Sequence, residues 1–365
     1  MKALRHIQFP TWAWSFIGAL IVLVITFIVS GSRSAQTLTL AFTIAPYLVL
    51  VAIGQMLVMS AGPGNIDVSV AKIFSLGGLL SISIGTTTGS WILGLAAAAG
   101  AGFIMSTISL TSILLVRIPP IVATLATSLI ASAVSLTLAK SFQGSAAPVL
   151  KAFLNWAPFG IPAFAVIVLL FTALVGAILA WTTWGARMLA VGQARRAAEY
   201  AGVNATRILV VVYLSSGVLA ALAGALRASF SAPNVELGND YLLDSIAVVV
   251  IGGTLITGGR AAPAGVWGGA LFFILLGGLL NLVGWNFAGQ NVLKGFLVLA
   301  VLFLASGAPL IRKRQVSGQR RSSSDDQHNQ TKDTKDTKNT KNTKNTKERI
   351  SSAEKAQTQT SKAQQ

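Results

Sequence analysis

Acidic side chains are the main candidates for chemistry in the first 310 residues, and there are five: Asp67, Glu199, Glu236, Asp240 and Asp244. Only Asp67 and Asp244 lie near apolar segments, so they offer little for a proton or sodium relay. The two histidines, His6 and His328, lie near the ends of the chain, and cysteine is absent. The sequence also lacks a Gly-x4-Gly-Lys-Ser/Thr phosphate loop. We therefore predict no catalytic residue, no metal site, no cofactor and no ATP hydrolysis by this chain.

Asp67 belongs to a polar interruption in an apolar region. Pro63 and two glycines precede it, and Asn65 and Ser69 flank it. Asn65, Asp67 and Ser69 can satisfy backbone groups freed by this break, and Asp67 or Ser69 can cap the helix that follows. The alternative is that the three line a translocation pathway. We expect these residues to brace the connection in preference to contacting the solute, because the site lies near the cytoplasmic edge of the membrane. Lys72 could neutralise Asp67 or reach lipid headgroups.

A second interruption falls at Gly252 and Gly253, within the short apolar segment 243–257. Membrane proteins break helices in this way beside a pathway, so both glycines are candidates to line one. Close helix packing is the alternative, and we favour it over a phosphate cradle.

The segment 183–207 contains a predicted short helix, with Arg195, Arg196, Ala197, Ala198, Glu199 and Gly202 as its candidate functional residues. Alanines favour the helix, and Gly202 is placed to end it in the left-handed conformation. Such a helix can fit a groove in a partner protein. A plain amphipathic surface helix is the alternative that the pattern leaves open.

The composition indicates which kind of structure holds these residues in place. Hydrophobic residues make up 53% of the 365 positions and charged residues 11%, against about 25% in soluble domains. Residues 1–310 hold only 14 Lys/Arg and 5 Asp/Glu, so we assign them to a transmembrane domain of an all-α polytopic protein. Ten spans are predicted, some short or broken, at residues 12–30, 40–60, 66–85, 91–116, 120–138, 162–181, 208–229, 243–257, 264–285 and 293–310.

Basic residues near the span ends predict the orientation. One side would carry eleven: Lys2, Arg5, Arg117, Arg187, Arg195, Arg196, Arg207, Arg260, Arg312, Lys313 and Arg314. The other would carry five: Arg33, Lys140, Lys151, Arg227 and Lys294. We therefore expect a multi-pass protein of the bacterial cytoplasmic membrane with both termini in the cytoplasm.

Residues 311–365 form a different kind of segment. They repeat Thr-Lys-Asp/Asn/Glu and contain almost no large apolar residue, so we expect a disordered cytoplasmic tail. Its lysines suit membrane lipid better than nucleic acid, which we do not expect as a partner.

Four blocks in order give residues 39–310 a resemblance to the permease subunits of ribose-type ABC importers, a family that includes autoinducer-2 permeases. The blocks are Gly54–Met59 with Asn65–Val70, Arg117–Thr127, Gly185–Gly224, and Ile246–Gly259 with Lys294-Gly295. Family members often carry acids where Arg195 and Arg196 stand, a small residue at Lys72 and an acid at Leu243, so this chain departs from the pattern there.

The resemblance implies a set of partners and a mechanism. Two permease subunits, either two copies or a paralogous pair, would form the pathway for a simple sugar or sugar-like solute. A solute-binding protein would dock outside, and an ATPase subunit would dock under the Arg195–Gly202 helix. A branched-chain amino-acid ABC permease is the near alternative, and an ion-coupled secondary transporter is the more distant one.

Overall fold

Helices dominate the structure, a computed structural model that describes residues 12–31, 34–140 and 144–306. Within these residues there is no strand, and the predicted all-α class is confirmed. Each predicted span contains one helix: α1 (Ala13–Ser30), α2 (Ser34–Ser60), α3 (Val70–Thr88), α4 (Trp91–Leu114), α5 (Pro120–Lys140), α7 (Ala163–Trp181), α10 (Ala205–Phe230), α11 (Asn239–Ile251), α12 (Pro263–Leu282) and α13 (Phe287–Ser306). The shorter helices are α6 (Pro148–Asn155), η2 (Pro158–Gly160), α8 (Thr183–Gln193) and α9 (Arg195–Tyr200). The tail 311–365 lies outside the described residues.

The long helices are built to cross a membrane. Seven of them, α2 to α5, α7, α10 and α12, are long and apolar enough to do so. Helix α1 is apolar as well, and it exposes large side chains such as Trp14 and Ile28. An apolar surface of this extent is unfavourable in water but suits lipid. The chain is therefore a polytopic membrane protein.

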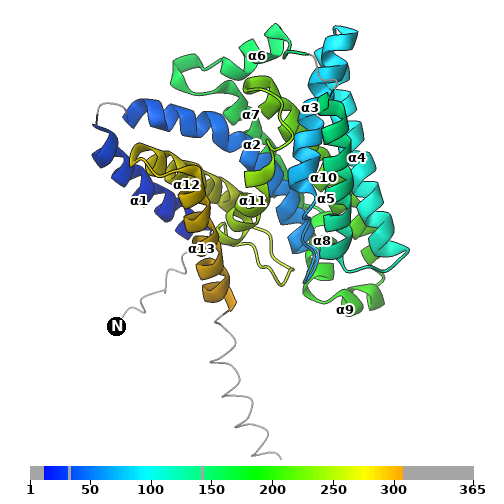
Figure 1. Cartoon of the computed structure of the whole chain (residues 1–365). Coiled ribbons are helices and arrows are strands. Elements are labelled where there is room, and N and C mark those ends of the chain that lie inside the picture. Colours follow the sequence, from blue (N-terminus) through cyan, green and yellow to red (C-terminus); the bar gives the residue numbers. More distant parts are fainter. Residues whose placement is uncertain (1–11, 32–33, 141–143, 307–365) are drawn as a thin grey trace, which may run out of the picture. The chain divides into compact units, whose positions relative to one another are not determined.

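Small residues let the central helices approach one another closely. Helix α10 packs against α3, α4 and α2, as Figure 1 shows. A side chain at Gly77 of α3 would collide with the backbone of Ala221, and one at Gly102 of α4 would collide with the backbone of Gly217. Small-residue packing of this kind replaces the hydrophobic effect as the source of helix association inside a membrane.

Helix α11 does not cross the membrane by itself. Its 13 residues span about 20 Å, whereas the hydrocarbon core is about 30 Å thick. It begins beside the first turns of α3, where the Gly238 amide donates to the Ser75 hydroxyl at 2.9 Å. The prediction of a short segment is confirmed. Its predicted start at 243 was late, because residues 239–242 form the first turn of α11.

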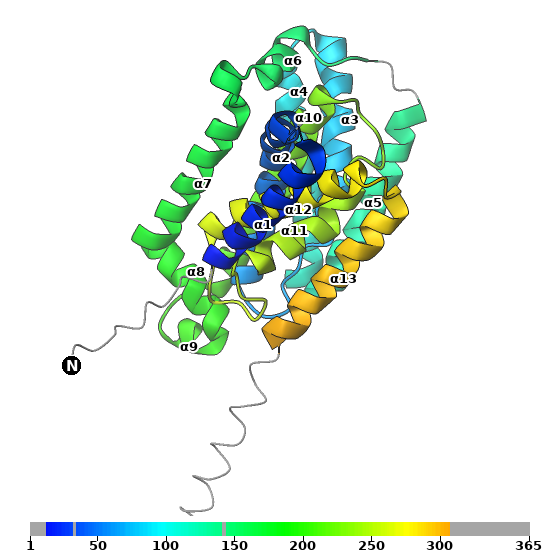
Figure 2. The same ribbon diagram turned by 90° about the vertical axis from the view of Figure 1, so that its left-hand side faces the viewer.

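Two ends of the helical bundle are defined by contacts between connections (Figure 1). At the α9 end, Gln193 Nε2 donates to the Gly259 carbonyl at 3.2 Å, and the Gly259 amide donates to the Ser60 carbonyl at 2.9 Å. At the α6 end, the Thr86 hydroxyl donates to the Ser145 carbonyl at 3.3 Å. Figure 1 shows α1 at the left edge of the bundle, and Figure 2 shows α7 along another edge.

Candidate functional site

Helix α9 is short and well terminated. The Gly202 amide donates to the Glu199 carbonyl and the Val203 amide donates to the Ala198 carbonyl, both at 3.0 Å. Gly202 has φ +82°, so these bonds form a Schellman cap with glycine in the left-handed position. The predicted helix and its end at Gly202 are confirmed.

The surface of α9 is mostly exposed. Only Ala198 is buried, whereas Arg196, Ala197 and Tyr200 face outward. Arg195 Nε and Glu199 Oε1 form a 3.0 Å ion pair, but their side chains are 54% and 44% exposed. A surface pair at i,i+4 adds only a few tenths of a kcal/mol, about 0.2–0.5. The cap and the burial of Ala198 therefore fix α9, and its charged residues remain available to a partner.

Helix α8, which the sequence analysis did not predict, anchors α9 to the bundle. Its first turn is capped by the Thr182 hydroxyl, which accepts from the Gly185 amide at 3.2 Å. Gly192 lies against the backbone of Ser60, at the end of α2. The threonine cap before an apolar helical repeat is the signal that could have revealed α8. Through α8, helix α9 is tied directly to the connection that follows α2.

Asp67 lies inside that connection and is almost completely buried, with 1% exposure. Its Oδ1 accepts from the Ser69 amide at 3.0 Å and from the Ser69 hydroxyl at 2.5 Å. Its Oδ2 accepts from the Ser216 hydroxyl at 2.8 Å. The expected bracing role is present here, and pathway lining by Asp67, Ser69 and the half-buried Asn65 stays a prediction.

Two expectations about this connection were wrong. Ser216 is eleven residues after Ala205, so Asp67 lies about 16 Å along α10 from its first residue and not at the membrane edge. Lys72 does not neutralise Asp67, because its Nζ donates to Asn239 Oδ1 at 2.8 Å. Both errors arise because contacts between segments distant in the sequence decide where Asp67 lies and which group Lys72 bonds.

Gly252 and Gly253 have separate roles in ending α11. Gly253 has φ +94°, and its amide donates to Val250 while the Thr254 amide donates to Val249, which forms a second Schellman cap. Gly252 is buried, and a side chain on Gly265 of α12 would collide with its carbonyl. Helix packing, the alternative expected for this stretch, is thus observed, and pathway lining by the two glycines stays a prediction.

The sequence analysis did not predict the partners of three charged side chains. Lys294 Nζ donates to Asp244 Oδ2 at 2.8 Å, and the two side chains are only 14% and 8% exposed. Arg227, counted among the five basic residues of the second side, lies in the last turn of α10, with its guanidinium 5.8 Å from the ring centre of Tyr47 and 5.6 Å from that of Phe230. Cation–π contacts of this type help a buried arginine.

The described residues contain no group of three or more His, Cys, Asp or Glu able to hold a metal ion. The fold and these sites define a membrane-embedded helical bundle with a short, anchored helix, α9, whose charged surface is exposed at one end. This is the architecture of a transport permease.

Comparison with known proteins agrees with the assignment as a transport permease. A family model described as "Branched-chain amino acid transport system / permease component" matches residues 36–306. The chain therefore belongs to this family of permease components, which are parts of transport systems and not enzymes.

Three relatives illustrate the similarity. The ribose import permease protein RbsC of Bacillus subtilis (strain 168) is 37% identical over 40% of this chain and 45% of its own length. RbsC of Escherichia coli (strain K12) is 29% identical over 70% of this chain and 81% of its own. The autoinducer 2 import system permease protein LsrC of Escherichia coli O9:H4 (strain HS) is 32% identical over 78% of this chain and 85% of its own. The chain thus spans less than half of the first relative and most of the other two.

Proposed function

We propose that this chain is the membrane-spanning subunit of an ATP-driven, binding-protein-dependent importer and forms the pathway for a simple sugar or sugar-like solute. The observation that carries the proposal is the anchored helix α9, which exposes a charged surface at one end of the bundle. The names of the ribose and autoinducer-2 relatives support the solute class.

The partners follow from the same arrangement. An ATPase subunit would contact α9 through Arg195, Arg196, Ala197 and Glu199, and the α9 end would face the cytoplasm together with both termini. A solute-binding protein would dock at the opposite, α6 end. A second permease subunit, either the same chain or a paralogue, would complete the pathway, with Asn65, Asp67, Ser69, Gly252 and Gly253 near it.

The α9 contact explains how energy could reach the spans. Movement imposed on α9 would pass through α8 to Ser60 and Gly259, which are joined by hydrogen bonds. From Ser60 it would pass through the 61–69 connection to Asp67 and then to Ser216 in α10. Each step joins packed or hydrogen-bonded groups, as coupling between distant sites requires.

A branched-chain amino-acid permease is the second candidate, because the family model carries that description. Uptake of radiolabelled ribose and leucine by cells that make the complete transporter, with and without this chain, separates the two. Ribose uptake that depends on the chain would support the sugar assignment. Leucine uptake that depends on it, without sugar uptake, would replace that assignment with the second candidate.

A further inference from the structure

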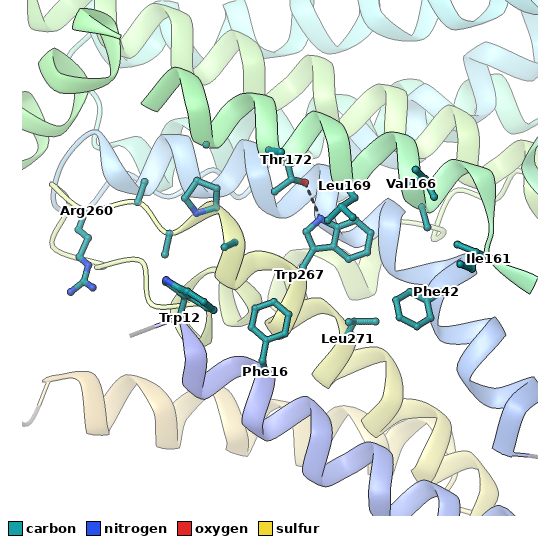
Figure 3. Close-up of a pocket in the computed structure, with 17 residues that line it drawn as sticks. Trp12, Phe16, Phe42, Ile161, Val166, Leu169, Thr172, Arg260, Trp267 and Leu271 are labelled. Carbon is teal, nitrogen blue, oxygen red and sulfur yellow. Dashed lines mark hydrogen bonds between the residues drawn. The ribbon is translucent and has the colours of Figure 1, made fainter. Parts of the chain in front are cut away.

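A large apolar cavity opens between α1, α7 and α12 (Figure 3). Its volume is about 680 Å³, and its walls include Phe16, Leu169, Gly176 and Leu271. This size falls within the usual range for sites that bind small molecules. Its lining includes none of the candidate pathway residues Asn65, Asp67, Ser69, Gly252 and Gly253, so the proposed transport function does not account for it.

The wall of the cavity suits hydrocarbon. Two buried polar side chains in the wall are already hydrogen-bonded: Trp267 Nε1 donates to the Thr172 hydroxyl at 2.9 Å, and that hydroxyl donates to the Val168 carbonyl at 2.7 Å. A cavity with an apolar wall does not hold ordered water well. An apolar occupant would therefore fill it more favourably than solvent or a sugar.

The cavity is elongated along α7. Ala165 and Gly176 both line it and are eleven residues apart, which corresponds to about 16 Å along the helix. One leaflet of a bilayer contributes about half of the roughly 30 Å hydrocarbon core. The length of the cavity thus matches one acyl chain that lies parallel to a membrane-spanning helix.

One end of the cavity carries a positive charge. Figure 3 shows Arg260 and Trp12 at one end and Ile161 at the other. Arg260 is exposed, and Trp12 is partly exposed. Tryptophan is favoured at the level of lipid headgroups, and arginine binds phosphate groups through several donors.

We propose that this cavity binds one acyl chain of a membrane phospholipid whose anionic headgroup lies beside Arg260. The apolar wall selects the hydrocarbon chain, and the guanidinium selects an anionic headgroup over a zwitterionic one. Charge complementarity at the Arg260 end and the one-leaflet length are the reasons to assign lipid and not a second copy of the chain.

Lipid binding to the purified protein tests the proposal. The probes are phosphatidylglycerol and phosphatidylcholine with the same acyl chains, added to detergent-solubilised protein and counted by native mass spectrometry. We expect phosphatidylglycerol to bind about fivefold more tightly, the effect of one basic residue near an anionic lipid. Arg260→Gln should remove this preference, whereas Arg207→Gln, at another exposed arginine, should keep it.

Variants that fill the cavity give a second test of the proposal. A Cβ at Gly176 would meet only Pro263, at 3.7 Å, so Gly176→Leu can fold and extend into the cavity. It should weaken binding of both lipids at least about tenfold. Gly100→Leu is the matched control, because this helical glycine of α4 also has open space and lies outside the cavity wall. Ala173→Phe, which fills the cavity from another position, repeats the test if Gly176→Leu is unstable.

Two results would overturn the proposal. One is unchanged lipid binding by both filled variants at normal thermal stability. The other is a change from dimer to monomer in Gly176→Leu with lipid binding intact, because that would assign the cavity face to a second copy of the chain. Neither result identifies the solute or the energy source of transport, so the proposed function is tested separately, by the uptake measurements.

Discussion

The Ser216 hydroxyl donates a 2.8 Å hydrogen bond to Oδ2 of Asp67, a residue 149 positions earlier in the chain. The other carboxylate oxygen is held by Ser69 through its amide and its hydroxyl. Asp67 thus fastens the connection between α2 and α3 to the middle of α10. Any movement that enters this connection from the α9 end is expected to reach α10 through the bond.

Removing the Ser216 hydroxyl should weaken the fold. Ser216→Ala leaves a buried carboxylate oxygen without its donor, so we expect the free energy of unfolding to fall by about 1–3 kcal/mol. Ser229→Ala is the control, because that buried hydroxyl of α10 bonds only the Ala225 carbonyl of its own helix. Thermal unfolding in detergent compares the two variants. Equal melting temperatures would show that the link to Asp67 contributes nothing.

Changes in α9 should uncouple transport without removing the protein from the membrane. Gly202→Val places a side chain at φ +82°, which costs about 1–2 kcal/mol, and Ala198→Asp puts a charge at a buried position. We expect normal membrane abundance, with poor ATPase binding or with hydrolysis that drives no uptake. Uptake and ATP hydrolysis are measured on the same membranes.

Gly89→Val is the matched control for Gly202→Val. Gly89 also has a positive φ, +67°, and open space around its Cβ position, but it ends α3 at the α6 end. It should carry a similar strain and keep coupling intact. Normal uptake in both α9 variants would mean that the coupling surface lies elsewhere.

The ion pair between Lys294 and Asp244 should behave as a buried pair. Lys294→Met leaves Asp244 charged and unpartnered, so we expect a loss of about 3–5 kcal/mol in the free energy of unfolding. Adding Asp244→Leu should restore most of it, because two apolar side chains can replace a buried pair. Lys72→Met is the control, since Lys72 bonds the neutral Asn239. A double variant as unstable as the single one would contradict this account.

Sequence patterns were sufficient for most of the fold. Each of the ten predicted spans holds a helix, because apolar runs of about 20 residues have few other structures open to them in a membrane. Local chemistry also revealed the left-handed end of α9 at Gly202. Helix ends were less accurate: α2 begins at Ser34 and not at 40, since polar residues extend it beyond the apolar run.

The sequence could not reveal which side chains from distant segments contact one another in the fold. Nothing near Asp67 identifies Ser216 as its partner, and nothing near Lys294 identifies Asp244. Lys72 lies five positions after Asp67, yet it bonds Asn239, because α11 enters the bundle beside α3. The cavity beside Gly176 is formed by helices far apart in the sequence, so no single segment shows it.

The composition of residues 311–365 leads to a prediction of its own. Because the segment has almost no apolar side chain to bury, deletion of residues 320–365 should leave membrane abundance and basal uptake unchanged. Immunoblots of membrane fractions and uptake rates compare the truncated and full chains. A large loss of either would give the lysine repeat a role in assembly or transport.

The energy source of transport tests the central claim most directly. Proteoliposomes that contain this chain with its ATPase subunit, supplied with the solute-binding protein outside, should accumulate radiolabelled ribose only when ATP is enclosed. The chain alone, given a proton or sodium gradient and no ATP, should accumulate none, because residues 1–310 hold only five acidic side chains for an ion relay. Gradient-driven uptake by the chain alone would contradict its assignment as the permease subunit of an ATP-driven importer.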